Sequence, residues 1–328
     1  MIIANRDKRT AQNFKFSRAL AESAADRELV RARSTPNVFV LFHTHQSISP
    51  LLRRKRKFIN SKSVLRYYCA KFKILRKGDH MKNTAFITGA TSGFGEAIAR
   101  ALSAQGYKII ALGRRKERLQ KLASELGNTH IIAADIRDKA AVFDAVSALP
   151  QNFKDVEVLV NNAGLALGLE GIAQTPVEDL ETMVDTNIKG VLYSTKAVLP
   201  LMIARKSGYI FNLGSTAGAW PYPGSHVYGA SKAFIKQFSR NIRNDLRGTG
   251  IRVTEIAPGI CKSEFSEVRF KGDVARAAAV YEGVDAILPE DIAQIVLSCL
   301  AMPRRVNINV VEAMATQQSW AGLFIEKH

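Results

Sequence analysis

The stretch TAFITGATSGFGEAIARALSAQG, from Thr84 to Gly106, decides the fold. It opens with a short apolar run, TAFIT, which is typical of a buried strand. A turn that contains Gly89, Gly93 and Gly95 follows. The remainder has apolar residues at helical spacing and stops at a glycine, as helices often do. The stretch therefore predicts a strand, a tight turn and a helix in succession.

The same alternation continues along the chain. Further apolar runs predict strands at residues 107–113, 129–136, 156–164, 208–215 and 251–259. Helical spacing predicts helices at residues 114–127, 139–149, 176–205 and 227–248. Strands that alternate with helices build a doubly wound α/β domain around a parallel sheet. The apolar strand runs agree with this fold class, because helices cover both faces of such a sheet.

Residues 1–80 differ in charge from the rest of the chain. They hold 19 Lys and Arg against 5 Asp and Glu, a net charge of +14, which leaves +4 of the chain's +18 for residues 81–328. We therefore expect residues 1–80 to be a basic leader, disordered or foreign to the natural protein, before a single domain at residues 81–328. Codons for Lys77–His80 can form a purine-rich run that suits a bacterial ribosome-binding site, so our hypothesis is that Met81 is the natural start. The alternatives are an organellar transit peptide and a basic surface for nucleic acid or membrane.

The composition argues against several classes of protein. Cys69, Cys261 and Cys299 show no CxxC spacing, which fits a reducing compartment such as the cytoplasm. The six histidines form no paired metal motif, so we expect no metal. No apolar run approaches the roughly 20 residues that a membrane-spanning helix needs. Since residues 81–328 are close to neutral, we expect no nucleic-acid partner either.

The glycine turn has the chemistry of a nucleotide site. Glycines let the backbone approach a pyrophosphate, and the helix that follows points unpaired N–H groups at the anion. Any tight turn can use glycines, but a turn after the first strand of an α/β domain predicts nucleotide binding. Besides its three glycines, the turn offers the nucleotide Thr91, Ser92 and Phe94.

The next two predicted strands end in residues that indicate which coenzyme binds. LGRRKER follows the second strand and lacks the carboxylate that would bond the 2′-hydroxyl of NAD. Arg114 and Arg115 can pair with a 2′-phosphate instead, so the pattern favours NADP; a solvated helix start is the alternative. Asp135 and Ile136, at the end of the third strand, would lie beside the adenine, unless Asp135 is only a surface cap.

A tyrosine and a lysine form the candidate catalytic pair. Tyr228 and Lys232 lie in VYGASKAF, one helical turn apart, and would share one face of a helix. A phenol has a pKa near ~10, and a neighbouring ammonium lowers it, which makes proton exchange with a carbinol or carbonyl oxygen feasible. Ser215, at the carboxyl end of the preceding strand, would bond the substrate oxygen or merely cap a turn. Tyr67 and Lys71 match the same spacing by accident.

These motifs occur in the order of a known family. TGATSGFG, NNAG at residues 161–164, Asn187, YGASK and a final PG span essentially all of residues 81–328. The chain resembles the short-chain dehydrogenase/reductase family, whose members have a Rossmann-type domain. The resemblance implies that Tyr228 is the acid/base, that Lys232 holds the nicotinamide ribose, and that Ser215 orients the substrate. Asn187 would support a water that links Lys232 to a proton relay.

The resemblance also assigns residues to the coenzyme and a partner to the chain. Asn162 would lie near the coenzyme ribose. The segment after the last predicted strand would close on the nicotinamide, through Pro258, Gly259, Ile260, Ser263 and Phe265. A small-molecule substrate and a homotetramer are further implications.

More narrowly, NNAGLALGLE, GSTAGAWPYPG and NINVVEAMATQQSWAGL resemble NADP-dependent 3-hydroxy acid dehydrogenases. Those enzymes act on serine, allo-threonine and 3-hydroxyisobutyrate, and in reverse on malonic semialdehyde. The resemblance implies a bound carboxylate, and Arg269 is our hypothetical partner for it; a surface arginine is the alternative. ICKSEF is one residue shorter than the common form and has Ser263 in place of Thr, which leaves the geometry of that loop open. The rival functions are reduction of another carbonyl, such as a 3-oxoacyl carrier or a dicarbonyl, and non-catalytic nucleotide or nucleic-acid binding.

Overall fold

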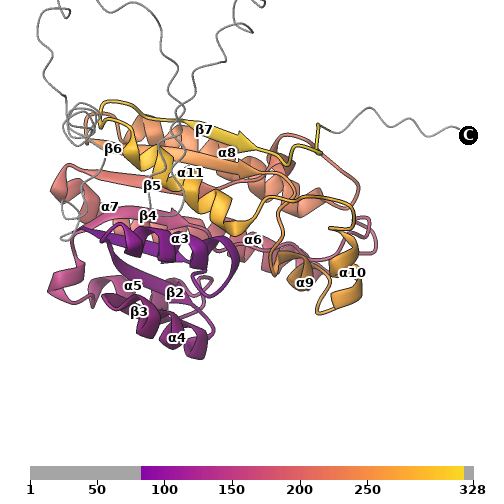
Figure 1. Cartoon of the computed structure of the whole chain (residues 1–328), viewed down its shortest axis with the longest axis horizontal. Helices are drawn as coiled ribbons and strands as arrows, with labels where there is room; N and C mark the ends of the chain where they lie inside the picture. Colours follow the sequence, from indigo (N-terminus) through magenta and orange to yellow (C-terminus); the bar gives the residue numbers. More distant parts are fainter. Residues whose placement is uncertain (1–82, 321–328) are drawn as a thin grey trace, which may run out of the picture. The chain divides into compact units, whose positions relative to one another are not determined.

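The computed structural model describes residues 83–320, so the expected leader at residues 1–80 lies outside the described residues. Within residues 83–320, seven strands form one sheet in the order β3-β2-β1-β4-β5-β6-β7, and all neighbouring strands are parallel (Figure 1). The strands are β1 (Thr84–Thr88), β2 (Lys108–Gly113), β3 (Thr129–Ala133), β4 (Val156–Asn161), β5 (Gly208–Leu213), β6 (Ile251–Pro258) and β7 (Val310–Ala313). The predicted doubly wound α/β fold is confirmed.

Helices cover both faces of the sheet. They are α3 (Gly93–Ala104), α4 (Lys116–Leu126), α5 (Lys139–Ser147), α6 (Val177–Val184), α7 (Gly190–Arg205), α8 (His226–Asp245), α9 (Phe265–Arg269), α10 (Val274–Ala279) and α11 (Pro289–Ala301). Short helical turns are η2 (Gln151–Phe153), η3 (Asp185–Lys189) and η4 (Thr216–Gly218). Figure 1 shows α3 and α11 across one face, where they contact each other, while α5, α7 and α8 pack on the other face.

Successive strand residues face opposite cores, as the pleat requires. On β1, Ala85 and Ile87 belong to the core under α3 and α11, whereas Phe86 belongs to the core under α5 and α7. All three side chains are fully buried. The continuous apolar runs in the sequence therefore correspond to strands that are covered on both sides.

Most predicted elements differ from the structure by up to three residues at an end, and two differences have a clear physical cause. The helix expected at residues 176–205 is divided into α6 and α7 by the π-helical turn η3. This turn holds Asn187, whose side chain bonds Leu165 and Ser231 instead of facing solvent. The strand expected at residues 129–136 ends at Ala133, because the Asp135 side chain accepts from the Arg137 backbone N–H and turns the chain.

No element is predicted after Gly259, yet the structure has α9, α10, α11 and β7 there. The helices α9 and α10 have five and six residues, too few to show a helical period in the sequence. The signal for α11 is present: Pro289 opens the helix, and Glu290 and Asp291 lie in its first turn.

A row of buried polar side chains joins the sheet to α7 and α8. Asn161, Asn212 and Glu255 are paired in register across β4, β5 and β6, and each is at most 2% exposed. Asn161 bonds Asn212 (2.8 Å) and, on α7, the hydroxyls of Ser194 and Thr195. Asn212 donates to the Ser239 hydroxyl of α8 (2.9 Å). The row thus fixes both helices against the sheet, since breaking it would leave buried polar groups unpaired.

Candidate active site

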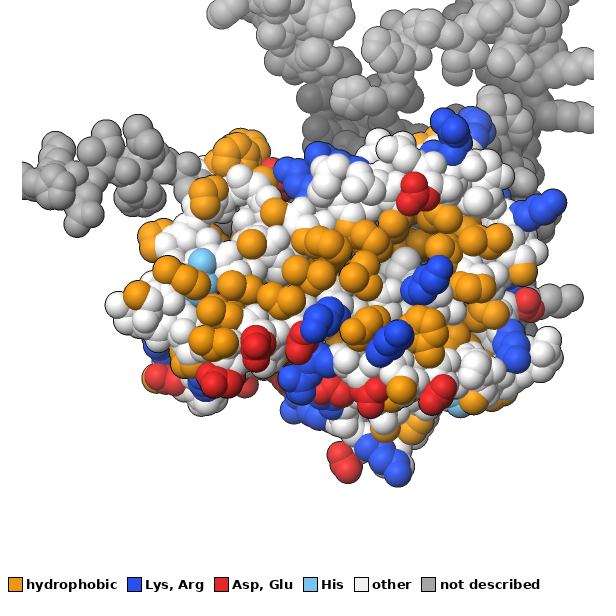
Figure 2. Space-filling model, turned by 180° about the vertical axis from the view of Figure 1, so that it is seen from behind, with side chains coloured by type: hydrophobic (Ala, Val, Ile, Leu, Met, Phe, Trp, Pro, Cys, Tyr) orange, Lys and Arg blue, Asp and Glu red, His pale blue; other side chains and the backbone are white. Residues whose placement is uncertain are grey.

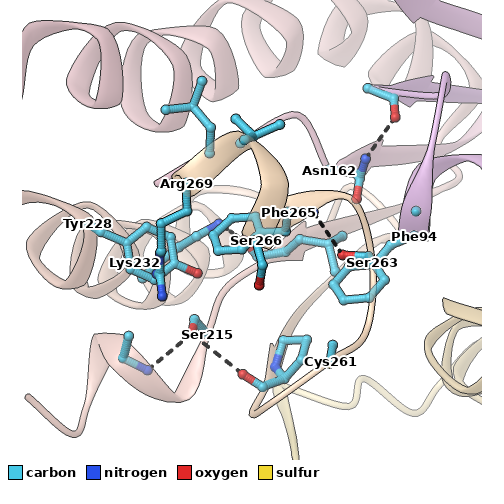
Figure 3. A pocket seen from close by; sticks show the side chains of 18 of the residues that line it. Phe94, Asn162, Ser215, Tyr228, Lys232, Cys261, Ser263, Phe265, Ser266 and Arg269 are labelled. Carbon is cyan, nitrogen blue, oxygen red and sulfur yellow. Dashed lines mark hydrogen bonds between the residues drawn. The ribbon is translucent and has the colours of Figure 1, made fainter. Parts of the chain in front are cut away.

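A cavity of about 640 Å³ lies at the carboxyl ends of the strands, the edge at which open α/β sheets bind ligands (Figure 3). Nineteen of the residues assigned to a site from the sequence line it. They are Gly89, Thr91, Ser92, Gly93, Phe94, Arg114, Arg115, Asp135, Ile136, Asn162, Ser215, Tyr228, Lys232, Pro258, Gly259, Ile260, Ser263, Phe265 and Arg269. Gly95 and Asn187 are not in the cavity lining.

The glycine turn leaves room for a ligand backbone. Gly89 and Gly93 have φ of +67° and +52°, which glycine adopts without strain. A Cβ on Gly95 would lie 2.3 Å from the Gly89 carbonyl oxygen, so a side chain there would displace the turn. Asn162 closes the turn from β4, donating to the carbonyls of Thr88 (2.9 Å) and Gly89 (3.2 Å). This bare cradle before the N-terminus of α3 fits the phosphates of a dinucleotide.

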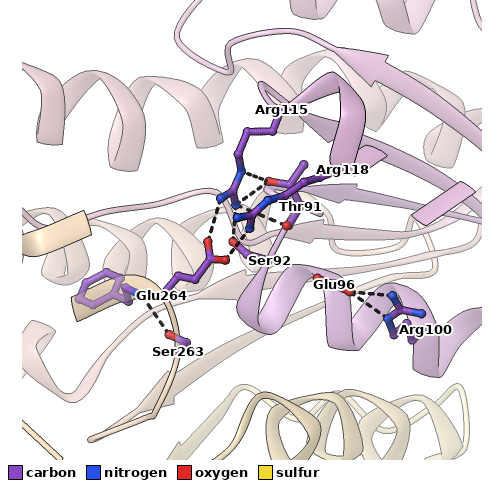
Figure 4. Close-up of polar contacts among 9 residues, drawn as sticks. Thr91, Ser92, Glu96, Arg100, Arg115, Arg118, Ser263 and Glu264 are labelled. Atoms are coloured by element: carbon purple, nitrogen blue, oxygen red, sulfur yellow. Dashed lines mark hydrogen bonds and ion pairs between the residues drawn. The ribbon is translucent and has the colours of Figure 1, made fainter. Parts of the chain in front are cut away.

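The two arginines after β2 differ in their surroundings. Arg114 is exposed and makes no hydrogen bond to the residues that the structure describes. Arg115 points back to the glycine turn and donates to the hydroxyls of Thr91 (3.0 Å) and Ser92 (2.7 Å). Arg115 also pairs with Glu264 at 2.8 Å (Figure 4). Glu264 was missed in the sequence, because its partner lies 149 positions earlier in the chain.

Asp135 and Ile136 follow β3 at the rim of the cavity. Asp135 accepts three hydrogen bonds from the Arg137 guanidinium, the shortest at 2.7 Å. Burial raises the pKa of Asp135, but the hydrogen bonds and charge of Arg137 outweigh burial and hold the pKa below its usual value. Ile136 is buried and offers the cavity an apolar surface. Both residues lie where the adenine was expected, and their contact with a nucleotide remains a prediction.

The helix α8 presents Tyr228 and Lys232 on one face, as their spacing predicts. Both side chains are buried, and the Lys232 ammonium lies 5.8 Å from the centre of the Tyr228 ring. Lys232 Nζ donates to the Leu213 carbonyl at the end of β5 (2.8 Å). Ser215, two residues further on, accepts from the Ala217 N–H (3.1 Å) and so also caps a helical turn. The three proposed catalytic side chains therefore converge from β5 and α8.

The acidity of Tyr228 differs from the sequence-based expectation. Burial raises the pKa of Tyr228 to about 12, and the nearby Ser215 hydroxyl lowers it only in part. Burial also lowers the pKa of Lys232 to about 8, against the opposing charge of Glu255. The expectation that a neighbouring ammonium lowers the pKa of Tyr228 is therefore wrong for this structure, because desolvation of the phenolate is the larger effect.

Asn187 lies behind the cavity in η3. Its carboxamide accepts from the Leu165 N–H (2.8 Å) and donates to the Leu165 carbonyl and the Ser231 hydroxyl. A Cβ on Gly164 would lie 3.3 Å from Asn187 Oδ1 and 3.4 Å from Lys232 Nζ, so the two side chains flank that glycine. Asn187 thus ties the loop after β4 to α8, and its proposed role in a proton relay stays a prediction.

Arg269 lies in the cavity and is not a surface residue. Its guanidinium carbon is 5.3 Å from the centre of the Tyr228 ring and 5.1 Å from that of Phe265 (Figure 3). Nη2 donates to the Tyr222 hydroxyl (2.9 Å). Nε is buried and has no hydrogen-bond partner among the described residues. A buried donor beside Tyr228 fits recognition of an anion.

The segment from Pro258 to Arg269 covers one side of the cavity. The Gly259 N–H donates to the Ala313 carbonyl (2.8 Å), and the Ile260 N–H donates to the Gln318 side chain (2.7 Å). The Phe265 ring packs against the Tyr228 ring at 5.6 Å. Four aromatic residues of the lining were missed in the sequence: Trp220, Tyr222, Tyr281 and Trp320. Their aromatic character alone did not separate them from core residues.

In residues 83–320 no group of three or more His, Cys, Asp or Glu side chains is placed to hold a metal ion. No helix in that range is long and apolar enough to cross a membrane.

The comparisons with known proteins agree with this geometry. The family "short chain dehydrogenase" matches residues 83–273. The "NADP-dependent 3-hydroxy acid dehydrogenase YdfG" of Salmonella typhi is 54% identical over 243 residues, which cover 74% of this chain and 98% of that protein. The "sulfoacetaldehyde reductase" of Chromohalobacter salexigens is 50% identical over 250 residues, 75% of this chain and 99% of that protein. A solved structure, "The Closed form of serine dehydrogenase complexed with NADP+", has a TM-score of 0.74 and 51% identity, and the match covers 75% of this chain and 100% of that chain.

The buried ammonium of Lys232 predicts a pH-dependent stability. Its pKa is about 8 when folded and near 10.5 when unfolded. Between these values the folded protein holds fewer protons, so this group makes the free energy of unfolding rise with pH, by roughly 3 kcal/mol in all. In Lys232→Met that rise is absent. Urea titrations from pH 7 to 10 should therefore show the wild type gaining stability relative to the variant.

The matched control is Lys121→Met, whose side chain is 77% exposed. It should follow the wild type at every pH. Parallel curves for the wild type and Lys232→Met would contradict a buried ammonium.

Proposed function

This chain belongs to the short-chain dehydrogenase family, and we propose that it oxidises short 3-hydroxy acids at C3, or reduces the matching 3-oxo acids. It is an NADP-dependent oxidoreductase that acts on CH–OH groups. The observation that carries the substrate proposal is the position of Arg269, whose guanidinium lies beside Tyr228 in the cavity. A carboxylate bound there would place a nearby hydroxyl at the catalytic tyrosine.

The coenzyme would be held by residues already described. The glycine turn and the first turn of α3 would bind the pyrophosphate, and Arg115 would bind the 2′-phosphate. Asn162 and Lys232 would lie near the nicotinamide ribose, and Ser263 and Phe265 near the nicotinamide. NADP, when bound, supplies the hydride or accepts it.

Tyr228 would exchange the proton of the substrate oxygen. Because its pKa is raised to about 12, Tyr228 carries its proton at neutral pH and is ready to donate it to a carbonyl oxygen. The phenolate left behind would face the cations Lys232 and Arg269. The Ser215 hydroxyl would bond the same substrate oxygen and orient it. At neutral pH Tyr228 is thus in the form that reduction needs, whereas oxidation needs the phenolate, so the rate of oxidation should rise with pH.

Arg269 would recognise the acid group of the substrate. Its Nη2 is occupied by Tyr222, but Nε is a buried donor without a partner among the described residues. Packing between the rings of Phe265 and Tyr228 restricts the guanidinium, which favours an anion of defined geometry. A sulfonate has the same charge, and one relative is named a sulfoacetaldehyde reductase. Reduction of another carbonyl compound is therefore the rival activity, and the experiments must distinguish it from oxidation of 3-hydroxy acids.

A second copy of the chain is the proposed protein partner, in a homotetramer. Figure 2 shows hydrophobic side chains gathered on the face opposite α3 and α11. On that side Leu192 and Ile203 of α7 are 37% and 45% exposed, and Phe234 stacks on Phe238 along α8. Exposed apolar surface of this kind marks an association site. The cytoplasm is the proposed location, since Cys261 and Cys299 are free thiols.

Activity assays test the reaction itself. NADP⁺ reduction should proceed with L-serine, L-allo-threonine or 3-hydroxyisobutyrate, and Tyr228→Phe should lower kcat by about 10²–10⁴-fold, because the proton carrier is lost. NADP⁺ binding by the variant, followed by fluorescence titration, should stay within about twofold. Failure of all three acids, with turnover of sulfoacetaldehyde or of 3-oxoacyl carriers, would overturn the substrate proposal.

A substrate pair tests Arg269. Arg269→Ala should raise KM for L-serine by about tenfold or more, because a buried charged partner is worth ~1.5–3 kcal/mol. KM for an uncharged 3-hydroxy analogue, such as the methyl ester, should change little. An unchanged KM for L-serine would rule the role out.

Sedimentation velocity tests the assembly. The purified chain should sediment as a tetramer at micromolar concentration. Leu192→Glu together with Ile203→Glu should yield smaller species, because charges on that apolar face oppose contact. Exposed Val274→Glu, on α10, is the control. A monomeric wild type would contradict the proposal.

A further inference from the structure

Two arginines of the α4 region converge on one carboxylate of the segment that covers the cavity. Arg115 Nη1 lies 2.8 Å from one oxygen of Glu264, and Arg118 Nη1 lies 2.5 Å from the other (Figure 4). Glu264 immediately precedes α9. The contact therefore joins the end of β2 to a segment almost 150 positions later in the chain.

Arg115 spans the glycine turn and this carboxylate. Its remaining donors bond the hydroxyls of Thr91 and Ser92. The guanidinium is thus surrounded by oxygen acceptors, the same chemistry that a phosphate offers. Arg115 is also one of the two arginines, with Arg114, that the sequence pattern assigns to the 2′-phosphate of NADP.

Glu264 is ionised in this position. Burial raises its pKa, but the hydrogen bonds and charges of Arg115 and Arg118 outweigh burial, and the pKa lies below its usual value. The protein therefore places a negative charge of its own at the 2′-phosphate subsite.

We propose that Glu264 competes with the 2′-phosphate of NADP for Arg115, and so links the choice of coenzyme to the segment that covers the substrate. The inference rests on NADP binding in this cavity and not on which acid is the substrate.

The physical basis is repulsion between two anions at one guanidinium. If the 2′-phosphate binds Arg115, the Glu264 carboxylate must either move away from Arg115 or remain close to the phosphate, whose charge has the same sign. Both side chains are more than a third exposed, so each ion pair is worth only up to about fivefold in an equilibrium constant. NAD carries an uncharged hydroxyl in place of the phosphate, so it does not compete with Glu264 for the Arg115 guanidinium.

The competition for Arg115 would also affect the part of the cavity beside Tyr228, because α9 connects Glu264 to that part. Phe265 follows Glu264 directly and packs on Tyr228, and Arg269 ends the same short helix. When Glu264 is released from Arg115, the segment can change the positions of Phe265 and Arg269. By linkage, whatever orders the segment through Arg269 changes the affinity for the 2′-phosphate by the same factor.

Coenzyme titration tests the competition. Kd for NADP⁺ and for NAD⁺ is measured by fluorescence with the full chain, Glu264→Gln and Glu267→Gln. Glu267 lies on α9, is exposed, and its side chain makes no hydrogen bond or ion pair within the described range.

Glu264→Gln should lower Kd for NADP⁺ by ~3- to 10-fold at low salt, less at 0.5 M salt, and leave Kd for NAD⁺ within about twofold. Glu267→Gln should change neither. A higher Kd for NADP⁺ in Glu264→Gln, or equal changes for both coenzymes, would overturn the proposal.

Hydrogen exchange tests the link to the segment. The probe is 2′,5′-ADP, which has the 2′-phosphate and no nicotinamide, and 5′-AMP is its control; both are used at saturation. In the wild type, 2′,5′-ADP should raise amide exchange in residues 264–270, whereas 5′-AMP should not. In the Glu264→Gln variant, amide exchange in residues 264–270 should be higher than in the wild type even without 2′,5′-ADP. Unchanged or lower exchange with 2′,5′-ADP in the wild type would overturn the link.

These results are separable from the substrate proposal. A chain that binds NADP⁺ but oxidises none of the acids fails the proposed function alone. A chain that oxidises them, but whose Glu264→Gln variant binds NADP⁺ no more tightly, fails this inference alone.

Discussion

The bond between the Lys232 ammonium and the Leu213 carbonyl is the interaction on which the site depends. It joins α8 to the end of β5, and so it sets Tyr228 on the helix relative to Ser215 after the strand. A buried ammonium is unfavourable, as the lowered pKa of Lys232 shows. The buried polar row of Asn161, Asn212 and Glu255 offsets this cost by holding α8 against the sheet. Its two amides are paired with side chains of α7 and α8. Glu255 adds the one negative charge that favours the ammonium.

Burial acts in opposite directions on the two members of the catalytic pair. It raises the pKa of Tyr228 and lowers the pKa of Lys232, so both groups are biased toward their neutral forms, while Lys232, with a pKa of about 8, is still mostly protonated at neutral pH. If Tyr228 donates its proton as proposed, the phenolate that remains is stabilised by a nearby cation, and the Arg269 guanidinium lies against the same ring. A carboxylate bound to Arg269 would neutralise part of that positive charge. In the proposed function, substrate recognition and proton transfer are therefore coupled electrostatically through one guanidinium.

The sequence was informative where the chemistry is local. The glycine turn and the spacing of Tyr228 and Lys232 are contiguous signals, and the residues assigned from them line the cavity, with Gly95 just behind it. Properties set by distant segments were not accessible. The π-helical turn depends on bonds from Asn187 to Leu165, 22 positions away, and the pKa of Tyr228 depends on burial by the whole cavity wall. Burial of this kind is a property of packing, which no local pattern records.

The covering segment is held at two points. The chain is held at Gly259 by the Ala313 carbonyl and again at Glu264 by two arginines. The stretch ICKS lies between these two anchors, so the shortening that the family resemblance implies would be confined to that stretch. Beyond Glu264, α9 carries Arg269 to Tyr222 over about 8 Å of helix. The carboxylate proposed to oppose the coenzyme phosphate would thus also position the arginine proposed to receive the substrate, because Glu264 directly precedes the short helix that ends at Arg269.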